Sequence, residues 1–359
     1  MKNSLITTSQ DTKLALSKVS SIFSLRNKLI HSKYTPPYFE LPLITNLTEE
    51  HYMAIDSEQV ISLFSEEGLN IAIFRHVINC NIGKNSKLVT YSKVLSKYLF
   101  ELIKQVDFEA SKRIYTIKEC LLAKNRPFCD NVDEIIIYGA EEITYKELKI
   151  FQSFDVNISI IANFNQKVSN YLITKKEIKN LLPNNEEYYS NEIFYNTKEI
   201  IDFTKALFPT FKIYTDSERG GRKPLLLIGY NQQQKILEII ENFSSSLSSI
   251  LILLPFAKDV DDIFNTLKEK VNCSYYYNKL SGDFNISNIH ITTFESSKDF
   301  LYDYVIIPDF QNFNSNIKCK NNITENDYYL AFRKARTTLF LLSSKKLNID
   351  SETCNIQYF

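Results

Sequence analysis

Short apolar runs that alternate with amphipathic helical patterns are the feature that most limits what this chain can fold into. In the first half, KLVTY (87–91) precedes SKVLSKYLFELIKQV, and EIIIYG (134–139) precedes TYKELKIFQSF. In the second half the strand candidates, again separated by helical patterns, are PLLLIGY (224–230), ILILLP (250–255), NIHITTF (288–294) and YDYVIIP (302–308). Strands that alternate with helices predict βα units and parallel sheets, so we expect an α/β fold.

The length of the chain and one polar stretch indicate its domain organisation. Its 359 residues are enough for two or three domains that each bury a core. The stretch LLPNNEEYYS (181–190), polar and with a proline, indicates a linker between two α/β halves. We therefore expect an N-terminal helical extension over residues 1–45, a first domain over 46–182 and a second over 190–359.

Bulk composition excludes several classes of protein. The 42 basic and 42 acidic residues give a formal net charge of zero, so the whole chain has no electrostatic signature of nucleic-acid binding. None of the 6 cysteines forms a CxxC pair and the 4 histidines are scattered, so we expect free thiols, no metal site and no disulfide framework. No apolar run reaches about 18 residues and the N-terminus lacks an apolar signal segment, which predicts a cytoplasmic protein without membrane association.

The order of the segments resembles the core of superfamily 1 helicases of the UvrD/Rep-like type, from about Leu47 to Ser343. The resemblance rests on several stretches in the right order, which is more specific than any single motif. It implies two RecA-like domains with the P-loop NTPase fold that flank a cleft. The stretches that carry large insertions in active members, such as 107–131, are short here, which implies minimal accessory insertions.

The place of the phosphate loop lacks the residues that bind a nucleotide. VISLFSEEGLNIAIFRHV (60–77) contains one glycine, Gly68, and no lysine occurs between His51 and Gly83. A phosphate loop needs several glycines, a lysine for the β- and γ-phosphates and a hydroxyl for magnesium. Glu66 and Glu67 would instead repel a phosphate. We expect no nucleotide triphosphate to bind here.

The stretch IIIYGAEEIT (135–144) resembles the VDEAQD strand of the helicases. There an aspartate holds magnesium and a glutamate activates water, but this chain has Tyr138 and Gly139 in the two places. Glu141 and Glu142 follow too late to replace them. We interpret both glutamates as solvated acids near a helix start, where the helix dipole favours negative charge.

Three further positions of the resemblance concern the γ-phosphate, and two of them have changed. In NQKV, Gln166 keeps the place of the glutamine that senses the γ-phosphate, but a structural role suits it without a phosphate. Tyr195 replaces an arginine that contacts the γ-phosphate. Lys334, between Arg333 and Arg336, stands at the arginine-finger position, where a lysine lacks the bidentate fork. The vestigial cleft positions are therefore Gly68, Tyr138, Gly139, Gln166, Tyr195 and Lys334.

The motifs that touch nucleic acid in the helicases retain more of their pattern. The candidate nucleic-acid-binding residues are Thr90, Tyr91, Ser92, Phe164, Thr292, Thr293 and Lys298. The hydroxyls would contact the backbone, and Phe164 would stack a base. Ser92 as an ordinary helix cap and Phe164 as a core residue are the alternative interpretations.

The combined losses indicate an inactive ATPase site, because loss of one phosphoryl-transfer group can cost on the order of a thousandfold. We therefore expect no catalytic residues, no cofactor and no metal. The first hypothesis is a pseudohelicase that acts as a binding or scaffold subunit with a protein partner, in DNA repair, a mobile element or anti-phage defence. The second is an ATP-independent module that binds single-stranded nucleic acid. The third is an active ATP-dependent helicase with an atypical site.

Overall fold

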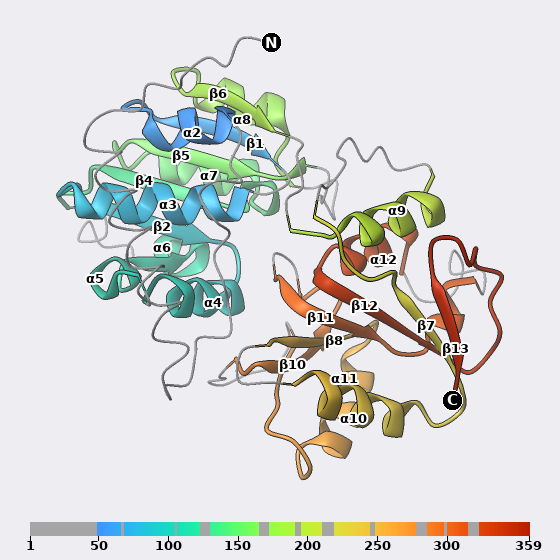
Figure 1. The fold of residues 1–359 in the computed structure, drawn as a ribbon. Helices are drawn as coiled ribbons and strands as arrows, with labels where there is room; N and C mark the ends of the chain where they lie inside the picture. The colour runs from blue at the N-terminus through green and yellow to red at the C-terminus, as the bar shows by residue number, and fades with distance from the viewer. Residues whose placement is uncertain are drawn as a thin grey trace. The chain divides into compact units, whose positions relative to one another are not determined.

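The chain divides into two compact units, Met1–Glu192 and Ile193–Phe359 (Figure 1). The computed structural model describes residues 49–65, 68–104, 106–122, 130–164, 172–190, 195–209, 219–244, 248–277, 286–297, 300–314 and 323–359. The predicted N-terminal extension over residues 1–45 lies outside this part of the chain.

Unit 1 contains a parallel six-stranded sheet with the order β3-β2-β4-β5-β1-β6. Its strands are β1 (Ile61–Ser65), β2 (Ser86–Thr90), β3 (Ile114–Thr116), β4 (Glu134–Tyr138), β5 (Ile158–Ala162) and β6 (Glu186–Ser190). The inner strands are buried along their whole length, because helices cover both faces of a parallel sheet. The expected α/β fold with a parallel sheet is confirmed.

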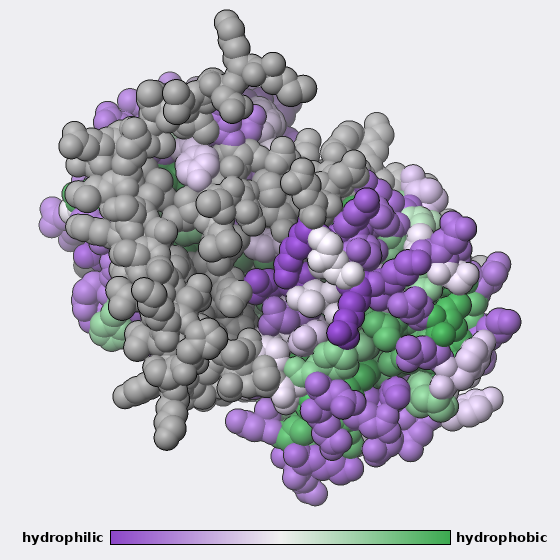
Figure 2. Space-filling model, viewed as in Figure 1, coloured by the Kyte–Doolittle hydropathy of each residue, from purple (hydrophilic) through white to green (hydrophobic). Residues whose placement is uncertain are grey.

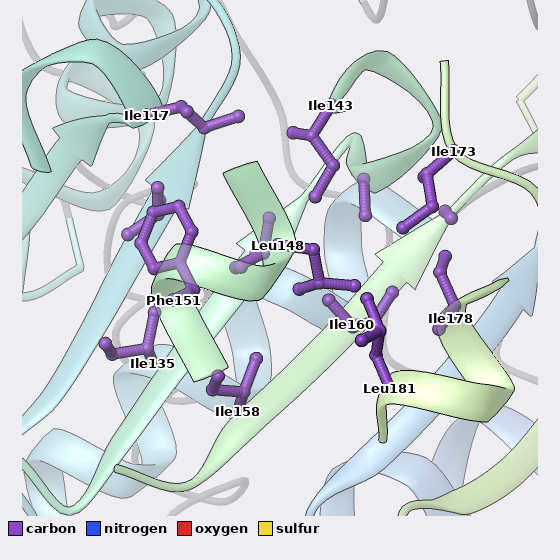
Figure 3. Close-up of a cluster of buried hydrophobic side chains, with 14 of the residues drawn as sticks. Ile117, Ile135, Ile143, Leu148, Phe151, Ile158, Ile160, Ile173, Ile178 and Leu181 are labelled. Carbon is purple, nitrogen blue, oxygen red and sulfur yellow. The ribbon is translucent and has the colours of Figure 1, made fainter. Parts of the chain in front are cut away.

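The helices of unit 1 place one core on each face of this sheet. They are α2 (Glu49–Asp56), α3 (Gly68–Asn81), α4 (Lys93–Lys104), α5 (Phe108–Ser111), α6 (Ile117–Leu122), α7 (Tyr145–Gln152) and α8 (Lys175–Leu181). Helix α3 packs against β1, β2, β4 and β5. Apolar side chains of α7 and α8, such as Leu148, Phe151 and Ile178, meet Ile158 and Ile160 of β5 in a second cluster (Figure 3).

Unit 2 repeats the design with a parallel seven-stranded sheet in the order β13-β7-β12-β11-β8-β10-β9. The strands are β7 (Leu225–Ile228), β8 (Ile250–Leu254), β9 (Ser274–Tyr276), β10 (Ile289–Thr293), β11 (Tyr302–Ile307), β12 (Ala335–Ser343) and β13 (Asn355–Tyr358). The helices are α9 (Lys198–Leu207), α10 (Gln232–Phe243), α11 (Ala257–Leu267) and α12 (Glu325–Phe332). Apolar residues of α10 and α11 share a core with the inner strands, and the outer surfaces of these two helices are mostly hydrophilic (Figure 2).

One prediction about domain organisation is wrong. The stretch Leu181–Ser190 is not a linker, because it contains the end of α8 and the edge strand β6. Strand β6 pairs with β1 in parallel, with Phe64 opposite Tyr189. The division between the units falls after Glu192 instead.

A buried carboxylate at the start of β4 joins the elements of unit 1. Glu134, 4% exposed, accepts from Arg75 Nε at 2.8 Å and from Asn79 Nδ2 at 2.6 Å, and Ser159 Oγ also donates to it. The remaining nitrogens of Arg75 donate to three backbone carbonyls, those of Ala54, Ser57 and Gln59. A buried ion pair is tolerated only when its other polar atoms are also bonded, and this network meets that condition.

Replacing Glu134 by alanine tests this network. We expect Glu134→Ala to lower the free energy of unfolding by about 3 kcal/mol or more, because it leaves the Arg75 guanidinium buried without its carboxylate. Urea unfolding followed by circular dichroism measures the change. The control is Glu109→Ala, since Glu109 and Lys112 form an exposed ion pair at 2.7 Å. Such a pair is worth about 1 kcal/mol or less, and equal effects of the two variants would contradict the expectation.

Burial also sets the protonation of His76 in α3. Its Nε2 donates to the carbonyl of Ala110 at 3.0 Å, which leaves Nδ1 to accept from the Ser86 hydroxyl at 3.1 Å. Desolvation lowers the pKa of His76 from 6.5 to about 4. The unfolded chain therefore binds the proton at higher pH than the folded chain does, and the stabilising effect of the neutral ring is lost as pH falls from about 6.5 towards 4.

The protonation of His76 and its effect on stability can each be measured as a function of pH. We expect the ring resonances of His76 to stay unchanged from about pH 8 to about pH 5, while unfolding becomes easier over the same range because the unfolded imidazole takes up a proton. An NMR titration and urea unfolding at each pH check both parts. A resonance of His76 that titrates near its ordinary pKa would contradict this assignment.

Candidate functional site

The carboxyl-terminal tip of β4 lies beside the start of α3, where the resemblance would place a nucleotide's phosphates. A β-carbon built on Gly68 would lie 2.4 Å from Cγ2 of Ile161 and 3.8 Å from Cε2 of Tyr138. Tyr138 is itself 6% exposed. The start of α3 is therefore packed against an aromatic ring and an aliphatic side chain, both without charge.

Gly139 occupies the place of the expected catalytic glutamate, and a side chain does not fit there. Its φ of +75° is left-handed, which favours glycine. A β-carbon on Gly139 would lie 2.7 Å from Cδ1 and 2.9 Å from Cε1 of Tyr91. The Tyr91 ring thus covers the backbone at the position where the resemblance would place a carboxylate.

The interpretation of Glu141 as a solvated acid is wrong. Glu141 is 1% exposed, and its Oε2 accepts a hydrogen bond from the backbone N–H of Asn163 at 2.9 Å. The carboxylate ties the short helix η3 (Ala140–Glu142) to the end of β5. After η3, Thr144 begins helix α7 with a capping box, since Glu147 accepts from both its N–H and its hydroxyl.

Most candidate nucleic-acid residues of unit 1 have a structural contact. Thr90 is fully buried, and the Ser92 hydroxyl accepts from the N–H of Leu95 at 3.1 Å, which confirms its alternative interpretation as a helix cap. Tyr91 is half-buried on Gly139. Phe164 is half-buried too, and its ring centroid lies 5.8 Å from that of Phe64.

The prediction that the hydroxyls of Thr292 and Thr293 reach a ligand is not met in this conformation. Thr292 is fully buried, and its Oγ1 donates to the carbonyl of Tyr276 at 2.6 Å. Thr293 is 7% exposed, and its Oγ1 donates to Ser296 Oγ at 2.9 Å. Both hydroxyls serve the local packing of β10, and burial of this kind depends on neighbours that the sequence pattern does not reveal.

The basic residues in and beside the arginine-finger position pack within unit 2. Arg336 lies 3.6 Å from Asp303, and the Arg333 guanidinium lies 5.6 Å from the Tyr329 ring centroid. Lys334 is 5% exposed. Tyr195 is also buried, and its carbonyl accepts from Arg219 Nη1 at 2.8 Å.

Some predictions lie outside the described residues, and the structure adds one group. Glu66, Glu67, Gln166 and Lys298 are not described. Within the described ranges no three His, Cys, Asp or Glu side chains are arranged to hold a metal ion, and no helix there is long and apolar enough to cross a bilayer.

The sequence reasoning missed Lys175 and Tyr189, which lie beside Phe64 and Phe164. The only local signal is the aromatic content of EEYYS, a stretch whose polarity favours a linker instead.

Comparison with known proteins shows the fold. No protein-family model matches the chain, and no curated protein matches it. A structure of S. cerevisiae Dbp5 bound to RNA and ADP BeF3 has 11% sequence identity and a TM-score of 0.55, covering 95% of this chain and 93% of that chain. A variant of Dbp5 in the same kind of complex has 10% identity and a TM-score of 0.54, covering 99% and 95%. The chain therefore has a helicase-like fold of two RecA-like domains, while its assignment to superfamily 1 stays a prediction.

Replacing Gly139 tests the packing at the tip of β4. We expect Gly139→Ala to destabilise the protein by about 1–2 kcal/mol from the left-handed backbone, with a further cost from the contact with Tyr91. Gly83→Ala is the matched control, since Gly83 has a φ of +90° and a β-carbon built on it would meet nothing within 4 Å. Urea unfolding should show the larger loss for Gly139→Ala. The difference between the two losses of unfolding free energy should become smaller in a Tyr91→Ala background, which lacks the ring. An unchanged difference would contradict the contact between position 139 and Tyr91.

Proposed function

We propose that this protein is a catalytically inactive member of the helicase-like fold that acts as a binding or scaffold subunit of a nucleic-acid-processing or defence complex. The observation that carries the proposal is the tip of β4. Tyr138 lies against the start of α3, and Tyr91 covers the backbone of Gly139. An ATPase needs a magnesium ligand and a base at these two positions, and here both are used for packing.

The chemistry of phosphoryl transfer explains why these two positions weigh so heavily. Protein groups act in this reaction by placing the phosphates and neutralising developing charge, and the uncharged Tyr138 and Gly139 cannot do either. The described part of the phosphate-loop region offers no lysine near Gly68. Arg336 is paired with Asp303, and Arg333 packs on Tyr329. Both arginines of the arginine-finger motif therefore have a role within their own unit.

A second candidate function is binding of single-stranded nucleic acid without ATP. Phe164 is half-buried at the end of β5, and Lys175 lies 5.6 Å from its ring centroid. An aromatic ring beside a cation suits a base and its phosphate. Two Dbp5 structures with the same fold contain RNA, and a third contains the proteins Nup159 and Gle1, so both kinds of partner occur with this fold.

The absence of ATPase activity is the first test of the proposal. We expect no magnesium-dependent phosphate release above background at millimolar ATP, with or without single-stranded DNA or RNA, because the groups for metal binding and water activation are lacking. A phosphate-release assay and a thermal shift with Mg·ATP measure turnover and binding. Release that disappears in a Lys334→Ala variant would support an active helicase with an atypical site.

Substitution at the strand tip tests whether Tyr138 and Gly139 alone prevent catalysis or whether the phosphate-binding groups near Gly68 are missing as well. We expect Tyr138→Asp combined with Gly139→Glu to remain inactive and to be less stable than the wild type, since the glutamate meets the Tyr91 ring and the left-handed backbone. Phosphate release by this double variant would show that the region around Gly68 still holds a triphosphate.

Affinity purification from the native host followed by mass spectrometry identifies the partner that the scaffold function requires.

A further inference from the structure

Three aromatic rings gather where β1, β5 and β6 end in unit 1. The ring centroid of Phe64 lies 5.8 Å from that of Phe164 and 5.3 Å from that of Tyr189, with tilted planes. Phe64 is 3% exposed and forms the floor of the group, while Tyr189 on the edge strand is 46% exposed. We name Phe64, Phe164, Tyr189 and Lys175 the aromatic platform.

Lys175 extends across these rings from the first residue of α8. Its Nζ lies 5.4 Å from the centroid of Phe64, 5.6 Å from that of Phe164 and 5.9 Å from that of Tyr189. It forms no ion pair with any residue in the described part of the chain. One helical turn later, Lys179 Nζ lies 5.5 Å from the Tyr189 ring.

The carboxylates closest in sequence to Lys175 are already bonded elsewhere. Glu177 accepts from the N–H and the hydroxyl of Thr174 in a capping box. Glu187 accepts from Lys179 at 2.6 Å and from the Tyr189 hydroxyl at 2.7 Å, and Glu186 accepts from Ser57 and Tyr188. Among the residues that the structure describes, Lys175 therefore has no carboxylate partner for its charge on this surface.

The helix itself does not favour a positive charge at this position. A lysine in the first turn of a helix is opposed by the helix dipole, and like charges four residues apart repel each other. Burial and the charge of Lys179 lower the pKa of Lys175. An anion bound beside the two lysines would relieve both effects, and an exposed tyrosine on an edge strand offers a flat surface next to that anion.

We infer that the aromatic platform binds single-stranded nucleic acid, with an unpaired base stacked on Tyr189 or Phe164 and a phosphate next to Lys175. This inference rests on the second candidate function and names its surface. Single strands combine an exposed ring face with a negative charge in each nucleotide, which matches rings next to a cation without a carboxylate partner among the described residues. Base stacking does not depend on sequence, so the platform accepts any base.

Fluorescence anisotropy with labelled dT15 and U15 at about 50 mM salt tests the inference, because electrostatic contacts are strong at low salt. We expect Tyr189→Ala to weaken binding about tenfold or more. Tyr189→Phe should bind like the wild type, since it keeps the ring and loses only the hydroxyl bonded to Glu187. Lys175→Glu should weaken binding and lower the salt slope by about one.

A matched control is available on α5. Lys112 Nζ lies 4.3 Å from the exposed ring of Phe108, so Phe108→Ala and Lys112→Glu make the same chemical changes on another surface. These controls should bind like the wild type. Circular dichroism melting checks that each variant folds, and crosslinking of a 4-thiouridine oligonucleotide to the chain should map to Tyr189 or Phe164.

The outcomes separate the inference from the function on which it rests. If the wild type binds single strands and the platform variants weaken no more than the α5 controls, the platform is overturned while nucleic-acid binding stands. If the wild type binds neither oligonucleotide at micromolar protein, both are overturned and the scaffold function remains. Loss of a co-purified protein in Tyr189→Ala, with oligonucleotide binding unchanged, would assign the surface to a protein and overturn the inference.

Discussion

The buried carboxylate of Glu134 fixes the frame on which unit 1 depends. Its partners Arg75 and Asn79 both lie on α3, so the bonds hold this helix against the start of β4. Helix α3 has 14 residues, about 21 Å at 1.5 Å per residue, and it begins at Gly68 near the opposite end of the strand. Contacts at the amino-terminal edge of the sheet therefore also set the position of the helix start at the carboxyl-terminal edge. The helix needs no bound phosphate to hold it there.

The two faces of the sheet differ at this carboxyl-terminal edge in which side chains are exposed to solvent. On the α3 side, Tyr138 packs toward Gly68, and Tyr91 covers Gly139. On the α8 side, Tyr189 stays exposed and Lys175 has no carboxylate partner among the described residues. Packing of uncharged rings closes the first surface, whereas the second keeps an exposed ring beside a cation that has no carboxylate partner among the described residues. In an α/β sheet the carboxyl ends of the strands are the usual binding edge, and the surface that we propose for single strands lies at this end of the fold.

Sequence reasoning recovers the parts of the fold that apolar pattern specifies. Inner strands such as β4 and β8 are continuous apolar runs because helices bury both of their faces, and such runs are easy to recognise. Strand β6 escapes this reasoning because EEYYS lies at a sheet edge, where solvent replaces one neighbour and polar residues are accepted. Glu141 and Thr292 escape it for a different reason. Their burial depends on single partners, the N–H of Asn163 and the carbonyl of Tyr276, that are distant in sequence.

The altered motif positions are integrated into the cores of their units, which bears on how such a site changes over time. A lost catalytic residue on a loose surface can return by one substitution. Here Gly139 has a left-handed backbone under the Tyr91 ring, and Lys334 is buried in unit 2. Restoring a carboxylate at the strand tip requires a change of backbone conformation and a new place for Tyr91. If the proposed function holds, this reversal removes a stabilising contact before any chemistry is regained, so packing opposes the return of activity.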